Sequence, residues 1–300
     1  MNRRSLILLL TLAALWGASY LFIKIALRGF SPAEVSSIRT ALAAAVLLPV
    51  AIRRGALRGL GRRAPEVALL GTIHMAVPLT LIALGEKHIA SSLAGILVAA
   101  SPIFTALLAP MVDPSERSSG LRLVGIVIGI VGVGLLLGLD LSGDSKALLG
   151  GVMVVLAGFG YAVAGFIVKR RFAGVPAVGL VSGTTLSSAL LLAPFAVLSA
   201  PPGAPGLGPV AALTVLGVAG TGIAFLIYYT LLATAGPAKA SLVAYIAPGF
   251  SVFYGAFFLD ESLTVSTFAG LVLILVGSWL AADGRLPRRL RSTQPEVAAS

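Results

Sequence analysis

The sequence predicts an all-α integral membrane protein with ten transmembrane helices, arranged as two inverted five-helix repeats. Composition is the first reason for this prediction. Of the 300 residues, 58% are hydrophobic and only 11% are charged, whereas a soluble domain carries roughly 25% charged residues. So few charges cannot solvate a globular surface, and the missing solvent is lipid. Cysteine is absent, which excludes disulfides and thiolate metal sites.

Apolar stretches of membrane-spanning length are the second reason. A membrane-spanning helix needs about 20 mostly apolar residues. Charged or Pro/Gly-rich breaks separate ten such stretches, which are residues 6–27, 32–52, 66–84, 89–112, 119–139, 147–168, 175–200, 207–233, 237–259 and 265–282.

The ends of these stretches differ in how clearly the sequence marks them. The first follows Arg3 and Arg4 and resembles a signal peptide, but its bulky residues suit a cleavage site poorly, so we predict an uncleaved first helix. The second begins at a capping box, with Ser31 as N-cap and Glu34 three residues later. The seventh is the least clearly marked, because serines and threonines dilute its apolar character. A basic and polar tail is expected at 285–300.

The lysines and arginines predict the orientation in the membrane. If the N-terminus is cytoplasmic, Arg28, Lys87 and Lys146 lie outside, Lys24 and Arg39 lie within spans, and the other 17 of the 22 lie inside. Short cytoplasmic loops carry this excess in membrane proteins. We therefore predict a plasma (inner) membrane protein with both termini cytoplasmic. The net charge of +11 is explained by this orientation and not by a nucleic-acid partner.

An internal repeat is the third reason for the predicted fold. At an offset of 145 or 146 residues, like residues align across five spans. The aligned pairs include Trp16 with Tyr161, Lys24 with Lys169, and Pro102 with Pro248. Because five is odd, the second half enters the membrane inverted. Inverted repeats are typical of alternating-access transporters, whose binding sites lie at the repeat interface near the midplane.

Several segments resemble a known family. "LWGASYLFIKIAL" followed by "SPAEVSSIRTALAAAVLLP" is similar to the first two helices of EamA-like members of the drug/metabolite transporter superfamily, and "APGFSVFYGAFFLDESLTVSTFAGLVLILVGSWL" resembles their Pro-containing and Glu-plus-Gly segments. The resemblance implies two five-helix repeats, 1–140 and 147–284, before the tail. It also implies movement of small metabolites, commonly amino acids or drug-like compounds, and often export.

Lys24 lies about one turn before the outer end of the first predicted helix. Helical side chains lean toward the N-terminus, so its ammonium leans into the membrane. Trp16 and Tyr20 lie on roughly the same face. This stripe favours a cavity wall for an amphipathic or anionic solute. Anchoring at the membrane interface is the alternative, since lysines commonly extend to water there.

Arg39 lies about seven residues inside the second span and leans toward the outer surface. A charge this deep usually faces the protein interior. The resemblance also places an arginine here, and a structural or gating role and contact with substrate remain alternatives.

Prolines mark three expected bends. Pro78 removes a helical hydrogen bond to the carbonyl of His74 near the middle of the third span. That position offers an imidazole and a free carbonyl together, although His74 could simply bond to a neighbouring helix. Pro102 and Pro248 occupy matched places in the two repeats and predict a hinge or a cavity-lining bend.

We expect a solute to bind between the two halves. Aromatic rings would supply apolar surface, and Lys24 and His74 would supply polar ends. Packing against neighbouring helices is the alternative for the tyrosines of spans eight and nine. The expected site residues are Trp16, Tyr20, Lys24, Arg39, His74, Tyr161, Tyr228 and Tyr245.

The sequence also narrows the chemistry. Every Asp and Glu falls at a span end or in a loop, so proton coupling through His74, or no coupling, is expected. No ligand set or nucleophile–base arrangement is present, so we predict no enzyme, metal or cofactor. Glycines in the fifth and tenth spans predict close packing within the chain or, alternatively, a homodimer. The leading function is small-molecule transport, and a non-transporting membrane sensor or scaffold of the same fold is the alternative.

Overall fold

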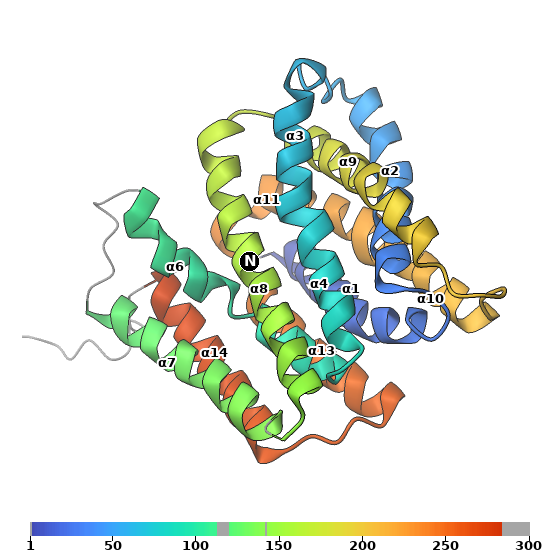
Figure 1. The fold of residues 1–300 in the computed structure, drawn as a ribbon. Coiled ribbons are helices and arrows are strands. Elements are labelled where there is room, and N and C mark those ends of the chain that lie inside the picture. The colour runs from blue at the N-terminus through green and yellow to red at the C-terminus, as the bar shows by residue number, and fades with distance from the viewer. Residues whose placement is uncertain (1, 113–119, 142, 284–300) are drawn as a thin grey trace, which may run out of the picture.

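A computed structural model describes residues 2–112, 120–141 and 143–283, and all of its regular elements are helical (Figure 1). The α-helices are α1 (Arg3–Ala26), α2 (Pro32–Arg53), α3 (Ala64–Gly71), α4 (Val77–Glu86), α5 (Ser91–Val98), α6 (Ser101–Val112), α7 (Leu121–Leu135), α8 (Ser145–Arg171), α9 (Ala177–Leu198), α10 (Leu207–Gly217), α11 (Ala224–Ala235), α12 (Pro237–Ala240), α13 (Val243–Leu259) and α14 (Val265–Asp283). Shorter segments are the 3-10 turn η1 (Gly61–Arg63) and the π-helical turns η2 (Thr72–Ala76), η4 (Leu136–Asp140) and η5 (Val218–Ile223).

Within this described part, nine helical stretches are long and apolar enough to cross a membrane, and α13 is a shorter apolar helix. They coincide with the ten predicted spans, so a multi-pass membrane protein is confirmed. The predicted start of the fifth span, residue 119, and the tail at 285–300 lie outside the described residues.

Two predicted spans are interrupted. The prediction of one continuous ninth helix over 237–259 is wrong, because α12 ends at Ala240 and α13 begins at Val243. The fourth span divides into α5 and α6 immediately before Pro102, as expected for a residue that cannot donate to the preceding turn. Pro248, its repeat partner, lies inside the continuous helix α13. The two matched prolines therefore bend the chain differently.

The start of α2 confirms the predicted capping box. The Ser31 N–H donates to Glu34 Oε2 at 2.7 Å, and the Glu34 N–H donates to Ser31 Oγ at 3.2 Å. These two bonds satisfy main-chain donors that a helix start leaves without partners.

The serines and threonines of α9 are buried, and their hydroxyl groups are hydrogen-bonded. The hydroxyls of Ser182, Thr185 and Ser188 each donate to the carbonyl four residues earlier. Ser188 also donates to the carbonyl of Gly71 at 2.9 Å, which joins α9 to α3. Side-chain donors satisfied by the helix itself explain why a weakly apolar sequence still forms a span.

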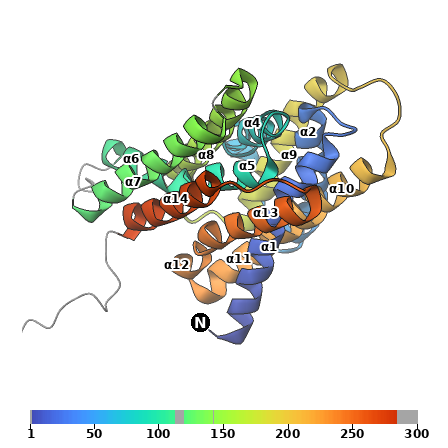
Figure 2. The ribbon, with the colours of Figure 1, turned by 90° about the horizontal axis from the view of Figure 1, so that it is seen from below.

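Two helix pairs lie side by side in both views: α7 with α14, and α2 with α9 (Figures 1 and 2). Glycines let α7 and α14 approach closely. A Cβ on Gly277 would lie 2.6 Å from the Cα of Gly129 and 2.7 Å from the carbonyl oxygen of Gly125. These glycines therefore pack within the chain. A Cβ on Gly134 or Gly138 would meet nothing within 4 Å, and a homodimer remains a prediction.

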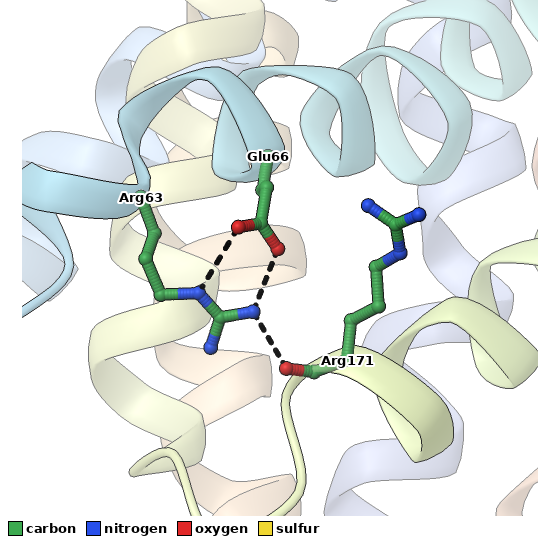
Figure 3. Close-up of polar contacts among 3 residues, drawn as sticks. All are labelled: Arg63, Glu66 and Arg171. Carbon is green, nitrogen blue, oxygen red and sulfur yellow. Dashed lines mark hydrogen bonds and ion pairs between the residues drawn. The ribbon is translucent and has the colours of Figure 1, made fainter.

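One end of the molecule is tied by basic side chains, and we refer to it as the basic end. Arg63 Nη2 donates to Glu66 Oε2 at 2.7 Å and to the carbonyl of Arg171 at 2.6 Å (Figure 3). Arg170 Nη2 donates to the carbonyl of Val112 at 2.6 Å. These bonds join the C-terminus of α8 to α3 and α6, which belong to the other half of the chain.

Candidate functional site: a central cavity

Helices from both halves of the chain enclose a cavity of about 930 Å³. Ligand pockets commonly measure about 300–1,000 Å³, so this one is large enough for a small organic solute. Eight of the residues singled out from the sequence line it, namely Trp16, Tyr20, Arg39, His74, Pro102, Tyr161, Tyr228 and Pro248.

The described lining of the cavity extends to exposed residues at the basic end. Its lining there includes Lys169, which is exposed, and Arg122. Toward the opposite end the lining stops at Ile23 and Ile82, which are 1% and 3% exposed, and at Gly95, which is also buried. The described side chains therefore form a cavity open at the basic end and sealed at the opposite end.

Aromatic rings form one wall. Trp16 of α1 lies 5.5 Å, centroid to centroid, from Tyr228 of α11 and 5.9 Å from Phe225 in an edge-on arrangement. Phe225 stacks on Tyr229 at 6.0 Å. Trp16 and Tyr228 were expected here from the sequence, whereas Phe225 and Tyr229 were not, although their spacing of one helical turn places them on the same face of α11. The wall offers apolar and stacking surface to a bound solute.

A second aromatic contact involves His74, which η2 carries into the cavity. Its ring lies edge-on to Tyr161 of α8, with centroids 5.9 Å apart. The helix widens into a π-turn before Pro78, which accommodates the bond that the proline cannot make. Pro78 itself does not reach the cavity lining. It is buried, and its Cγ would lie 3.1 Å from a Cβ on Gly160.

Arg39 is buried at the cavity wall with 8% of its surface exposed. Its Nε donates to Thr221 Oγ1 at 2.7 Å, and that hydroxyl donates to the carbonyl of Leu216 at 2.9 Å. Thr221 lies in η5, so a π-turn again supplies the partner. The guanidinium faces the protein interior, as expected for a charge at this depth. Sequence analysis missed Thr221, which nothing in its local pattern distinguishes from other threonines.

Lys24 does not line the cavity. Its Nζ donates to the main-chain carbonyls of Glu86 and Ile89, the latter at 2.7 Å. The ammonium thus satisfies carbonyls at the C-terminal end of α4, where positive charge is favourable. The structure matches neither alternative considered for this residue, a cavity wall or an anchor in the membrane interface. The contact depends on segments more than 60 residues apart, which local spacing cannot reveal.

Tyr245 also lies outside the cavity lining, and its hydroxyl is 3.5 Å from the carbonyl oxygen of Ser278 in α14. This is the packing arrangement considered as the alternative for that tyrosine.

Two carboxylates at the sealed end were predicted to lie at span ends, and sequence analysis gave neither a function. Glu261 follows α13, and its two oxygens accept hydrogen bonds from the main-chain N–H groups of Ser91 and Ser92 at 2.6 and 2.9 Å. Glu86 ends α4 and is fully buried. The local sequence Gly85-Glu86 at the end of the third span does not indicate that Glu86 is buried.

The helices and the cavity define a multi-pass membrane protein with a solute-sized chamber open at one end. The EamA-like transporter family matches this chain over residues 3–138 and 148–282, and the chain belongs to that family. The family expected from the sequence is thus confirmed.

Relatives agree with this membership, and a solved structure shares the fold. The chain is 27% identical to an "Uncharacterized transporter" of Archaeoglobus fulgidus, over 90% of this chain and 95% of the relative. It is 25% identical to the "Probable amino-acid metabolite efflux pump" of Escherichia coli (strain K12), over 95% and 96%. A solved structure titled "Crystal structure of protein" has the same fold, with a TM-score of 0.66 and 21% identity over 94% of this chain and 98% of that one. The two relatives are named as a transporter and an efflux pump, which is compatible with the prediction that the chain is not an enzyme.

Proposed function

We propose that the protein exports small amino-acid-like or drug-like solutes by alternating access at the central cavity. The observation that carries the proposal is a chamber of about 930 Å³ that both halves of the chain line, with described lining residues that are exposed at the basic end and buried at the opposite end. A transporter that alternates between two faces must pass through such a state.

Helix pairing supports an inverted-repeat architecture. Helix α1 packs on α13, and its repeat counterpart α8 packs on α5 and α6. Likewise α1 contacts α10 and α11, whereas α8 contacts α3 and α4. In addition, α2 packs on its own counterpart α9, and α7 packs on its own counterpart α14. A two-fold relation between residues 1–140 and 147–284 produces this set of contacts, and it would exchange the two ends of the molecule.

The π-turns follow the same relation. The turn η2 begins at Thr72 and η5 begins at Val218, which are separated by the repeat spacing of 146 residues. The first presents His74 to the cavity, and the second presents Thr221, the partner of Arg39. Corresponding irregular turns at a cavity wall are the form that substrate sites take in inverted-repeat transporters.

The lining suits a solute with a carboxylate and an apolar or aromatic part. Arg39 is the cationic group in the buried part of the wall, and only its Nε bonds to a described residue, which leaves the terminal nitrogens for an anion. The rings of Trp16, Tyr228 and Tyr161 can contact the apolar part. Tyr20 and His74 complete the proposed contacts, whereas Lys24 and Tyr245 lie outside them.

The direction of transport follows from orientation. We place the basic end in the cytoplasm, because short cytoplasmic loops carry the excess of Lys and Arg. The open cavity then faces the cytoplasm and can be loaded there, which fits export. The efflux pump among the relatives has the same direction in its name.

Solute flux into proteoliposomes tests the proposal. Radiolabelled L-phenylalanine and L-leucine, followed by a panel of other metabolites, would be assayed by counterflow against preloaded unlabelled solute, which needs no ion gradient. We expect saturable exchange of at least one zwitterionic amino acid. Folded protein that moves no member of the panel would overturn transport and favour a sensor or scaffold.

A further inference from the structure

The carboxyl group of Glu86 stands out among the buried polar groups of the described residues. The side chain is 0% exposed, and neither Oε1 nor Oε2 has a hydrogen-bond partner. The hydroxyl of Ser91, the first residue of α5, is also fully buried without a partner. Buried polar groups are nearly always hydrogen-bonded, so a carboxyl group left in this state requires an explanation.

The charged and titratable groups around Glu86 come from three other segments. Lys24 and Tyr20 belong to α1, Arg39 to α2, and Glu261 to the connection after α13. The Lys24 ammonium is held by main-chain carbonyls, and no ion pair or hydrogen bond joins this described side chain to the Glu86 carboxylate. Glu261 adds a second negative charge, whose oxygens are occupied by Ser91 and Ser92.

These contacts favour the neutral form of Glu86 in this conformation. Burying an ionised carboxylate without hydrogen-bond donors costs much more free energy than burying the neutral acid without a partner. The positive charge of Lys24 acts in the opposite sense, but two carbonyls and the C-terminal end of α4 already engage it.

The position of Glu86 connects it to the closure of the cavity. The cavity lining stops at Gly95, one helical turn after Ser91 in α5. Beyond it, Glu261 from the second half holds the start of α5 in the first half, and Lys24 holds the end of α4. We refer to Lys24, Glu86, Ser91, Ser92 and Glu261 as the closed gate. Opening this end must part the gate and admit water to Glu86.

We propose that Glu86 is a proton-binding site of the transport cycle, protonated while the gate is closed and deprotonated to the adjoining solvent when the gate opens. The inference rests on the proposed transport function and adds a proton to its cycle. The released proton passes to bulk water on that side of the membrane. The carboxylate that remains can then pair with Lys24, whose ammonium is freed as the α4–α5 connection moves.

A substrate-free measurement tests the proton site. The chain has no native cysteine, so Ser92→Cys reports gate opening through its reaction with an impermeant thiol reagent. Ala204→Cys, in an exposed loop, corrects for the pH dependence of the thiol. With one proton lost on opening, the corrected rate should rise up to about tenfold per pH unit. In Glu86→Gln the rate should be low and independent of pH, whereas the control Glu66→Gln, a partly exposed carboxylate at the basic end, should behave as the wild type.

Two further measurements keep the proposal open to refutation. Glu86→Asp retains a carboxyl group and should retain the pH response even if Glu86→Gln folds poorly. The infrared band of a protonated carboxylic acid should be present in the wild-type protein and lost in Glu86→Gln. A wild-type gate that ignores pH, or the same pH response in Glu86→Gln, would overturn the proton site. If the gate responds to pH but the protein moves no solute, the proposed transport function would be overturned and the proton site would stand.

Discussion

Removing the negative charge of Glu261 should loosen the start of α5. In the wild type, each carboxylate oxygen of Glu261 accepts a hydrogen bond from one main-chain N–H group. In Glu261→Gln the amide oxygen can still accept one of these bonds. The amide NH₂ cannot accept the other, so one N–H group is left facing another donor. Hydrogen bonds to a charged group contribute about 1.5–3 kcal/mol each, and a neutral one about 1 kcal/mol. The exchange of two charged bonds for one neutral bond therefore costs about 2–5 kcal/mol, and the lower value is used below.

Hydrogen exchange of amides at the start of α5 measures this change directly. A loss of about 2 kcal/mol corresponds to roughly 30-fold faster exchange through local opening. The assay is hydrogen–deuterium exchange with mass spectrometry in nanodiscs, following a peptide that spans Ser91 and Ser92. Glu66→Gln, at the other end of the molecule, should leave this peptide unchanged. Unchanged protection in Glu261→Gln would mean that the carboxylate does not hold these amides, and the gate as described would be refuted.

Three other outcomes are expected. Arg39→Gln should raise the half-saturation concentration for a carboxylate-bearing solute about tenfold or more, with less effect on its decarboxylated amine. Equal effects on both solutes would show that Arg39 does not bind the carboxylate. Gly277→Ala should lower the thermal stability in detergent, because a Cβ there meets main chain of α7 and overpacking costs about 1–3 kcal/mol, while Gly134→Ala should not; matching melting temperatures would contradict the α7–α14 packing. In intact cells, a single cysteine at Arg62 should resist an impermeant reagent and one at Ala204 should react, and the reverse pattern would invert the orientation.

The membrane-spanning helices could be predicted from the sequence because lipid imposes a simple rule on each stretch separately. Length and hydropathy identified all ten apolar helical stretches, and the start of α2 followed from the local pattern Ser31-x-x-Glu34. The interruption between α12 and α13 was missed, because its apolar residues satisfy the same rule whether the helix continues or stops. Apolar composition predicts that a segment lies in the membrane, but it does not predict where the helix in that segment is interrupted.

The cavity wall was predicted better than the gate, and the difference has a physical cause. Trp16 and Tyr20 share one face of a single helix, so helical periodicity alone places them together. The environment of Lys24 depends on where the end of α4 packs, and that of Glu86 depends on what covers it. Both require the tertiary arrangement of segments more than 60 residues apart.

The two ends of the cavity are held by unequal interactions, and this inequality bears on the transport cycle. At the basic end, Arg63 bonds across to the exposed carbonyl of Arg171 and pairs with Glu66 (Figure 3). Arg63 and Glu66 are about one-third exposed, and exposed ion pairs contribute about 0–1 kcal/mol. At the opposite end, Glu261 and Lys24 make charge-assisted bonds to main-chain groups in a largely buried region, each stronger than an exposed pair. Water competes poorly for the buried bonds, so we expect the state open at the basic end to be favoured when no solute is bound. Opening the opposite end then needs a favourable contribution to the free energy that offsets the loss of these bonds. Ionisation of Glu86 beside Lys24 can supply that contribution.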